Sequence, residues 1–287
     1  METSITMQHT YSGDGDGGGE RDGGGDARGS VNIAIMKAQA EEPEVAEAKD
    51  DRPGFVWLGG FRSDMDGTKA LAMVDEAANL NCDSLRFDYS GHGQSGGRFV
   101  DGTISKWVDE SLAVIENHTE GPQILVGSSM GAWIALRLAQ RLKEKSGSAP
   151  LAARIAGLLL IAPAPDFATR LMEPAFTAEQ HQEMQDKGYI EEPSAYSGEP
   201  NIITKALIDD GRNNQVLTGD LALGMPVRIL QGMEDPDVPY THALHLVECL
   251  AHDDVQITLI KDGDHRLSRD EDIALLRRTM SQMVAEY

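Results

Sequence analysis

Cysteines, aromatic residues and long apolar runs are all scarce in this 287-residue sequence. Its two cysteines, Cys82 and Cys249, lie far apart and lack metal-ligand spacing, which argues against a disulfide and favours a reducing compartment, the cytoplasm. The longest apolar run, 155–164, is too short for the ~20 residues of a membrane span. The first 30 residues contain no apolar signal sequence, and their acids outnumber their bases, which speaks against a transit peptide.

Positive charge is also in short supply. The chain has 25 Lys and Arg against 47 Asp and Glu, which gives a net charge of −22. Binding to nucleic acid requires a cationic face, and no dense cluster of Lys and Arg occurs. An anionic membrane surface would repel such a chain. These balances exclude nucleic-acid partners and indicate an ordinary soluble protein.

Glycine, in contrast, is concentrated near the beginning of the chain. Residues 12–29 contain nine of the 30 glycines and almost no apolar side chains. Such a segment cannot bury enough surface to offset its ordering entropy, so residues 1–30 are predicted to form a disordered, acidic tail. Its Asp-Gly run does not continue into a calcium-binding loop, because Gly25 stands where the loop from Asp14 requires glutamate.

From residue 31 to residue 287, short apolar runs alternate with amphipathic runs. A first strand at 31–40, which could lie at a sheet edge, is followed by strand-like segments at 54–60, 83–89, 122–128, 155–163, 226–232 and 255–261. Helix-like segments lie between them, at 67–79, 104–118, 130–143, 201–212, 240–250 and 270–285. This alternation predicts an α/β domain with a mostly parallel central sheet flanked by helices. Residues 165–200 interrupt it and are predicted to form a helical lid.

The segment "ILVGSSMGAW", residues 124–133, resembles a nucleophile elbow. In the motif G-x-S-x-G, a serine stands on a sharp turn between a strand and a helix, and small residues two positions away let the two backbones approach. Ser129 has Gly127 and Gly131 at these positions, whereas Ser128 does not. With a strand before it and a helix after it, Ser129 is predicted to be a nucleophile.

A serine nucleophile requires a histidine base and an acid that orients it, and on this type of sheet they follow in the order Ser, acid, His. Among the eight histidines, only His265 follows the last strand in a polar loop at its carboxyl end. Asp235 stands three residues after the strand 226–232 and is the preferred acid. Asp237 is the second choice. The other rival acids are Glu234, in the same loop, and Asp262 and Asp264, which flank the histidine.

Two backbone N–H groups are needed for the oxyanion that forms during acyl transfer. Met130 directly follows the nucleophile, and Phe61 lies in the loop Gly59-Gly60-Phe61 after the run "GFVWL", residues 54–58; these two are the predicted donors. The run "GHGQSG", residues 91–96, matches G-x-G-x-x-G but is followed by loop rather than helix, so no dinucleotide cofactor is expected. No cluster with metal-ligand spacing occurs, and the predicted chemistry needs neither cofactor nor metal.

Taken together, these residues resemble those of the α/β-hydrolase superfamily. Within it, the chain is similar to the group that contains mitochondrial palmitoyl-protein thioesterases, also known as acyl-glucuronide esterases, and their bacterial relatives. The shared stretches are "GGFRSDMDGTKA", "RFDYSGHGQSGG", "GPQILVGSSMGAW", "GMEDPDVP" and "DGDHR", within residues 54–287. The resemblance implies the α/β-hydrolase fold with Ser129 as nucleophile, Asp235 as acid and His265 as base.

The sequence therefore predicts a serine hydrolase that cleaves acyl thioesters or esters, small or protein-bound, through an acyl-enzyme. Two alternatives remain at this point. One is a general carboxylesterase for small or xenobiotic esters such as acyl glucuronides, and the other is a non-catalytic ligand-binding protein of the same fold. The oligomeric state is not set by these residues.

Apolar residues in the lid segment suggest a place for the acyl group. Phe167 and Leu171 are four residues apart, as are Met172 and Phe176, so in a helix each pair would share a face. The stripe is expected either to pack on the domain as core or to line a substrate pocket above the nucleophile.

Overall fold

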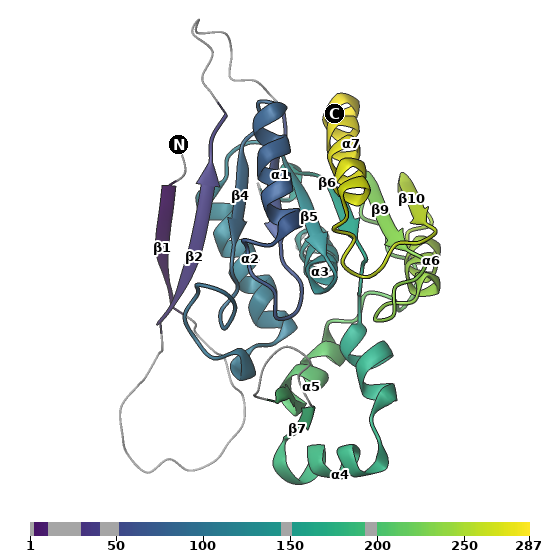
Figure 1. Ribbon diagram of the computed structural model, residues 1–287. Helices are drawn as coiled ribbons and strands as arrows, with labels where there is room; N and C mark the ends of the chain where they lie inside the picture. Colours follow the sequence, from purple (N-terminus) through teal and green to yellow (C-terminus); the bar gives the residue numbers. More distant parts are fainter. Residues whose placement is uncertain (1–2, 11–29, 41–51, 145–150, 193–199) are drawn as a thin grey trace, which may run out of the picture.

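Eight strands form one twisted sheet in the computed structural model, which describes residues 3–10, 30–40, 52–144, 151–192 and 200–287. Their spatial order is β1-β2-β4-β3-β5-β6-β9-β10 (Figure 1). Every pairing from β4 to β10 is parallel, and β2 is antiparallel to both of its neighbours, β1 and β4. The bounds are β1 Thr3–Thr10, β2 Ser30–Ala38, β3 Gly54–Leu58, β4 Ser84–Phe87, β5 Gln123–Ser128, β6 Ile155–Ile161, β9 Val227–Gly232 and β10 Val255–Ile260.

Helices cover both faces of this sheet, as continuous apolar strands require. On one face, α1 and α7 lie side by side in front of the sheet in Figure 1, and α2, α3 and α6 lie on the other face. Alternate residues of β3 illustrate the division, because Phe55 and Trp57 pack with α1 and α7 whereas Val56 and Leu58 pack with α2 and α3. The bounds are α1 Thr68–Asn79, α2 Ile104–His118, α3 Met130–Glu144, α6 Tyr240–Cys249 and α7 Asp270–Glu286, with short 3₁₀ turns η1 Phe99–Asp101 and η2 Ala152–Arg154.

The beginning of the chain differs from the sequence expectation. Residues 3–10, predicted to belong to a disordered tail, form β1, which pairs antiparallel with β2 from Thr3↔Lys37 to Thr10↔Ser30. The strand predicted at 31–40 is therefore covered on both sides, by β1 and β4, and is not the edge of the sheet. The rest of the predicted tail, 11–29, and most of the acidic connector after β2 lie outside the described residues.

An insertion follows β6 and returns to the sheet at β9. It contains the π-helical turn η3 Ala168–Met172, the 3₁₀ turn η4 Glu173–Ala175, helix α4 Ala178–Lys187, a two-stranded sheet of β7 Tyr189–Glu192 and β8 Asn201–Thr204, and helix α5 Lys205–Asn213. It lies at the end of the sheet where β6 leads out, in the lower part of Figure 1. The predicted helix at 201–212 therefore begins with a strand, and residues 193–199 of the predicted lid lie outside the described residues.

Within the described residues, no helix combines the length and the apolar character that a membrane crossing requires. Cys82 and Cys249 are both buried, and neither forms a disulfide.

Candidate active site

Ser129 lies on the turn between β5 and α3 with a backbone conformation that is unusual for a residue with a side chain. Its φ angle is +54°, in the left-handed region that favours glycine. Close backbone contacts leave no room for a side chain at either flanking glycine. A Cβ on Gly127 would lie 2.6 Å from the carbonyl oxygen of Gly131, and one on Gly131 would collide with the carbonyl oxygen of Leu58. The turn therefore holds the serine side chain out from the end of the sheet.

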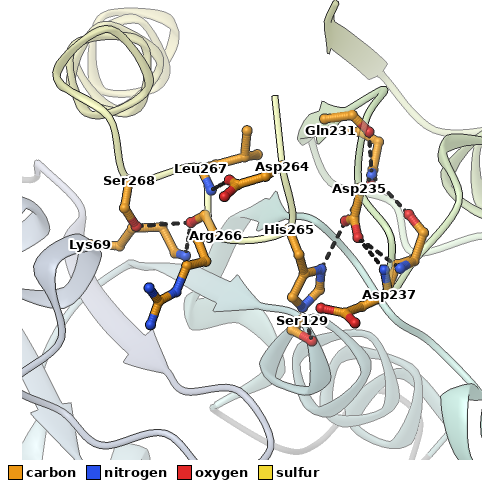
Figure 2. Close-up of polar contacts among 12 residues, drawn as sticks. Lys69, Ser129, Gln231, Asp235, Asp237, Asp264, His265, Arg266, Leu267 and Ser268 are labelled. Atoms are coloured by element: carbon orange, nitrogen blue, oxygen red, sulfur yellow. Dashed lines mark hydrogen bonds and ion pairs between the residues drawn. The ribbon is translucent and has the colours of Figure 1, made fainter. Parts of the chain in front are cut away.

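His265 and Asp235 continue from this serine in one hydrogen-bonded line (Figure 2). The Nε2 atom of His265 lies 3.0 Å from the Oγ atom of Ser129, and its Nδ1 atom lies 2.8 Å from Oδ2 of Asp235. The Asp235 side chain is fully buried, whereas that of His265 is 22% exposed. Ser129 and His265 are 136 residues apart in the sequence. The fold thus brings the three predicted residues together at the carboxyl ends of β5, β9 and β10.

The carboxylate of Asp235 is held by a set of donors. Its Oδ1 accepts the N–H groups of Asp237 at 2.9 Å and Val238 at 2.8 Å, and its Oδ2 accepts the side-chain amide of Gln231 at 3.2 Å. Burial opposes ionisation, but the hydrogen bonds from His265, Val238 and Asp237 outweigh it and hold the pKa of Asp235 below its usual value. The carboxylate is therefore charged and fixed in direction.

The rival acids have other positions. Asp264 accepts the N–H of Leu267 at 2.9 Å and so shapes its own loop, and the backbone N–H of Glu234 donates to Gly263. The exposed carboxylate of Asp237 lies near Asp235 and His265. One possible metal-ligand atom from each of these three residues lies within 4.8 Å of the other two. This group does not suit a resident metal, because both nitrogen atoms of His265 already face hydrogen-bond partners.

Both predicted oxyanion donors lie beside Ser129. Met130 is the first residue of α3, where a helix leaves its N–H groups without acceptors inside the helix. On the other side, a Cβ built on Gly60 would lie 3.5 Å from the Cβ of Ser129, which places the Gly60–Phe61 peptide next to the serine. Among the described residues, the N–H of Phe61 has no hydrogen-bond acceptor. The two amides are thus available on either side of the serine.

Lys69 is a residue near the site that sequence reasoning missed. Its ammonium donates a hydrogen bond to the backbone oxygen of Arg266, directly after His265 (Figure 2). Burial lowers the pKa of Lys69 to about 8, against the opposing effect of the Asp264 carboxylate. Lys69 and Arg266 are 197 residues apart in the sequence, and no local sequence pattern predicts this contact. Lys69 therefore supports the histidine loop from α1.

Main-chain hydrogen bonds join the loops of the site to one another. The N–H of Ser129 donates to the oxygen of Ile161 at 2.9 Å, that of Ala162 to Leu230 at 2.8 Å and that of Met233 to Ile260 at 2.8 Å. Glu234 N–H, one residue before Asp235, reaches Gly263 at 2.9 Å, two residues before His265. The positions of the three side chains are therefore set by backbone contacts that extend the sheet.

The predicted apolar stripe of the lid is only partly present. Phe167 is buried, with its ring 5.4 Å from that of Phe61, and Leu171 and Met172 pack half-buried on the core. The assumption of one continuous helix is wrong: η3 ends at Met172, a 3₁₀ turn containing Pro174 follows, and Phe176 has extended backbone. Phe176 is buried beside the ring of His181 at 5.7 Å, so Met172 and Phe176 do not share a helix face.

The model of the family described as Serine aminopeptidase, S33, matches residues 65–272, which contain Ser129, Asp235 and His265. The chain belongs to this hydrolase family. Palmitoyl-protein thioesterase ABHD10, mitochondrial, of Mus musculus is 33% identical to the hydrolase over 249 residues, which cover 86% of this chain and 80% of the mouse protein. The Homo sapiens protein of the same name is 33% identical over 238 residues, covering 82% and 74%.

Solved structures give the same result for the fold. A putative hydrolase from Agrobacterium vitis S4 is 47% identical, with a TM-score of 0.84 and 99% of each chain covered. Alpha/beta hydrolase domain-containing protein 10 from mouse is 31% identical, with a TM-score of 0.74 and coverage of 89% of this hydrolase and 95% of the mouse chain. The α/β-hydrolase fold and the resemblance to the palmitoyl-protein thioesterase group, both predicted from the sequence, are confirmed.

Proposed function

We propose that this hydrolase cleaves acyl thioesters or esters with Ser129 as its nucleophile. The observation that carries the proposal is the line from Ser129 through His265 to the buried Asp235, with Ser129 held at positive φ between a strand and a helix. A serine is a weak nucleophile until a neighbouring base removes its proton, and the base is effective when an acid fixes its tautomer.

The proposed cytoplasmic location remains a prediction from the sequence.

The proposed mechanism assigns one step to each group. His265 Nε2 takes the proton of the Ser129 hydroxyl as Oγ attacks the acyl carbon, and Asp235 stabilises the resulting imidazolium through Nδ1–H. The N–H groups of Phe61 and Met130 bind the oxygen as it becomes negative. The C–S or C–O bond then breaks, and His265 gives its proton to the departing thiolate or alkoxide. Water, deprotonated by His265, attacks the acyl-enzyme. As the carboxylic acid leaves, His265 returns this proton to the Oγ atom of Ser129.

The thioesterase name of the mammalian relatives supports an S-acyl substrate for this chain. A thioester and an oxyester present the same acyl carbon to Ser129 and differ in the leaving group, so the triad accommodates both. The alternative substrate class, small or xenobiotic esters such as acyl glucuronides, uses the same residues. Leaving-group preference is therefore the property that separates the two proposals.

The proposal is tested by labelling and turnover together. A fluorophosphonate probe is expected to label the wild-type protein and Ser128→Ala, and to leave Ser129→Ala unlabelled. Ser129→Ala should lose turnover by several orders of magnitude, because loss of a triad member leaves only binding and oxyanion stabilisation. Labelling that is lost in Ser128→Ala instead would reassign the nucleophile, and an unlabelled wild-type protein would favour a non-catalytic ligand-binding protein.

The substrate class is tested on matched compounds. Palmitoyl and octanoyl groups, each attached through sulfur and through oxygen, are compared with acetyl esters and an acyl glucuronide. We expect the highest kcat/KM on a long-chain thioester. A preference for acetyl esters or for the glucuronide would support the general carboxylesterase.

A further inference from the structure

The loop that brings Phe61 to Ser129 is a tight turn with one strained residue. The N–H of Ser63 donates to the oxygen of Gly60 at 3.2 Å, which closes a four-residue turn from Gly60 to Ser63. Arg62, the third residue of the turn, has a φ angle of +61°, where a side chain clashes with its own backbone and glycine is preferred. Contacts from outside the turn must therefore hold this conformation.

Inside the turn, a second hydrogen bond from Ser63 fixes the peptide that carries the proposed oxyanion donor. The hydroxyl of Ser63 donates to the oxygen of Gly60 at 2.9 Å, in addition to the Ser63 N–H. In a trans peptide, the C=O and the following N–H point in opposite directions. Fixing the Gly60 oxygen on the Ser63 side thus directs the N–H of Phe61 to the other side of the peptide.

A contact from outside the turn comes from His92, in the "GHGQSG" run to which the proposed function gives no role. Its Nε2 atom lies 3.2 Å from the backbone nitrogen of Arg62, and its Nδ1 atom lies 3.3 Å from the oxygen of Ser90. A backbone N–H only donates and a carbonyl only accepts, so the ring carries its single proton on Nδ1 and accepts at Nε2. A doubly protonated ring would be unable to accept the Arg62 N–H.

The surroundings of His92 maintain this neutral form. His92 is 4% exposed, and its ring lies among the rings of Tyr89, Phe99 and Trp107, at centroid distances of 5.5, 5.1 and 5.1 Å. Burial lowers the pKa of His92 to about 4. Trp107 also fixes the acceptor of the ring, because its indole N–H donates to the same Ser90 oxygen at 3.2 Å. The ring is therefore a rigid, neutral acceptor directed at the strained residue.

We propose that His92 is a positioning residue for the oxyanion site: it accepts the N–H of Arg62 and thereby holds the Gly60–Ser63 turn in the conformation that presents the N–H of Phe61 to the reacting acyl group. The inference rests on the proposed function, since it assumes acyl transfer at Ser129. The hydrogen bonds and ring contacts of His92 within the described residues involve neither Ser129 nor the other triad residues. It acts on the transition state through the backbone.

The test compares two substitutions at one position. His92→Phe keeps an aromatic ring among its neighbours but removes the acceptor, and His92→Gln keeps a side-chain oxygen that can accept the Arg62 N–H. We expect His92→Phe to lower kcat on an octanoyl ester by about 10- to 100-fold, somewhat less than the loss of a whole oxyanion donor, with little change in KM. The same variant should bind an alkylboronic acid, which forms a tetrahedral adduct on the serine, more weakly by a similar factor. His92→Gln should recover most of both losses.

Active-site concentrations are set by end-point fluorophosphonate labelling, so that loss of folded protein does not count as loss of kcat. A His92→Phe variant with wild-type kcat and boronate affinity would overturn the inference, as would a His92→Gln variant no better than His92→Phe. If phenylalanine is not accommodated, His92→Leu removes the acceptor with a smaller side chain, and the same outcomes apply. Failure of the proposed function is distinguishable, because the wild-type protein itself would then be unlabelled.

Discussion

The carboxylate of Asp166 accepts the backbone N–H of Leu217 at 2.9 Å, although 51 residues separate them in the sequence. Its other oxygen accepts the N–H of Val216 at 2.8 Å, and Arg170 lies 3.4 Å from the carboxylate. Asp166 stands just after β6 and Leu217 just after α5, so this side chain closes the base of the insertion. Burial raises the pKa of Asp166, and the two backbone hydrogen bonds work against that rise.

Asp166→Asn is expected to destabilise the insertion first. The substitution keeps the size of the side chain and tolerates the φ angle of +56°, but it turns an NH₂ group toward one of two buried N–H donors. We expect a loss of about 1–3 kcal/mol in unfolding free energy by urea denaturation and faster proteolysis between residues 165 and 217. Asp220→Asn, at a position whose side chain is 79% exposed, is the control. Equal stability of the two variants would contradict the role of Asp166.

The two aspartates of the acid loop are expected to respond differently. Asp235→Asn should lower kcat by up to about 10⁴-fold, because an amide at this position no longer enforces the tautomer that leaves His265 Nε2 free to accept a proton. Asp237→Asn should retain activity within about tenfold, since the Asp237 contact to Asp235 is made by its backbone N–H. Steady-state kinetics on an octanoyl ester measure both. A dead Asp237→Asn variant beside an active Asp235→Asn variant would reassign the acid.

Lys69 gives a prediction for pH. Its pKa in the folded protein, about 8, lies below the ordinary 10.5, so between these values the unfolded chain binds more protons at this residue than the folded protein does. The contribution of Lys69 to the free energy of unfolding therefore increases as the pH rises from about 8 to 10.5. As the pH falls, this contribution decreases over the same window and is lost once the pH has passed through 8. We expect the wild-type protein to gain up to about 3 kcal/mol relative to Lys69→Met across this window, as measured by urea unfolding at each pH. A difference that does not change with pH would show that the amine is not desolvated.

Two buried phenylalanines of the insertion form a matched pair for the acyl site. Phe167 and Phe176 are 8% and 9% exposed, but only Phe167 packs against Phe61. Each methylene of an acyl chain that enters an apolar pocket contributes up to ~0.8 kcal/mol, or roughly fourfold in kcat/KM. Phe167→Ala is expected to reduce the increase of kcat/KM from acetyl to octanoyl esters, and Phe176→Ala to leave that slope unchanged. An unchanged slope in both variants would place the acyl chain elsewhere.

Much of this arrangement could be predicted because it depends on local pattern and chain order. The glycines around Ser129 mark the elbow, and the rule that ligands gather at the carboxyl ends of parallel strands selects His265 and Asp235 from many candidates. Alternating strands and helices define the sheet. These signals lie within a few residues of the feature that they predict.

The remainder could not be predicted because it depends on contacts between distant segments. The bond from Lys69 to Arg266 and the closure by Asp166 join parts of the chain that no short motif links. The role of His92 depends on a backbone N–H 30 residues away and on a ring tautomer. The lid pattern was wrong for a different reason: spacing by four assumes a continuous α-helix, and the segment around Pro174 is not one.

The main-chain bonds that extend the sheet beneath Ser129, Asp235 and His265 also bear on how the protein loses activity with heat. Because these loops share hydrogen bonds with β6, β9 and β10, we expect them to unfold together with the sheet and not before it. A partly heated sample should then be a mixture of fully competent and fully inactivated molecules. The residual activity would then be proportional to the fraction of molecules that are still folded, and their KM would equal that of the unheated protein.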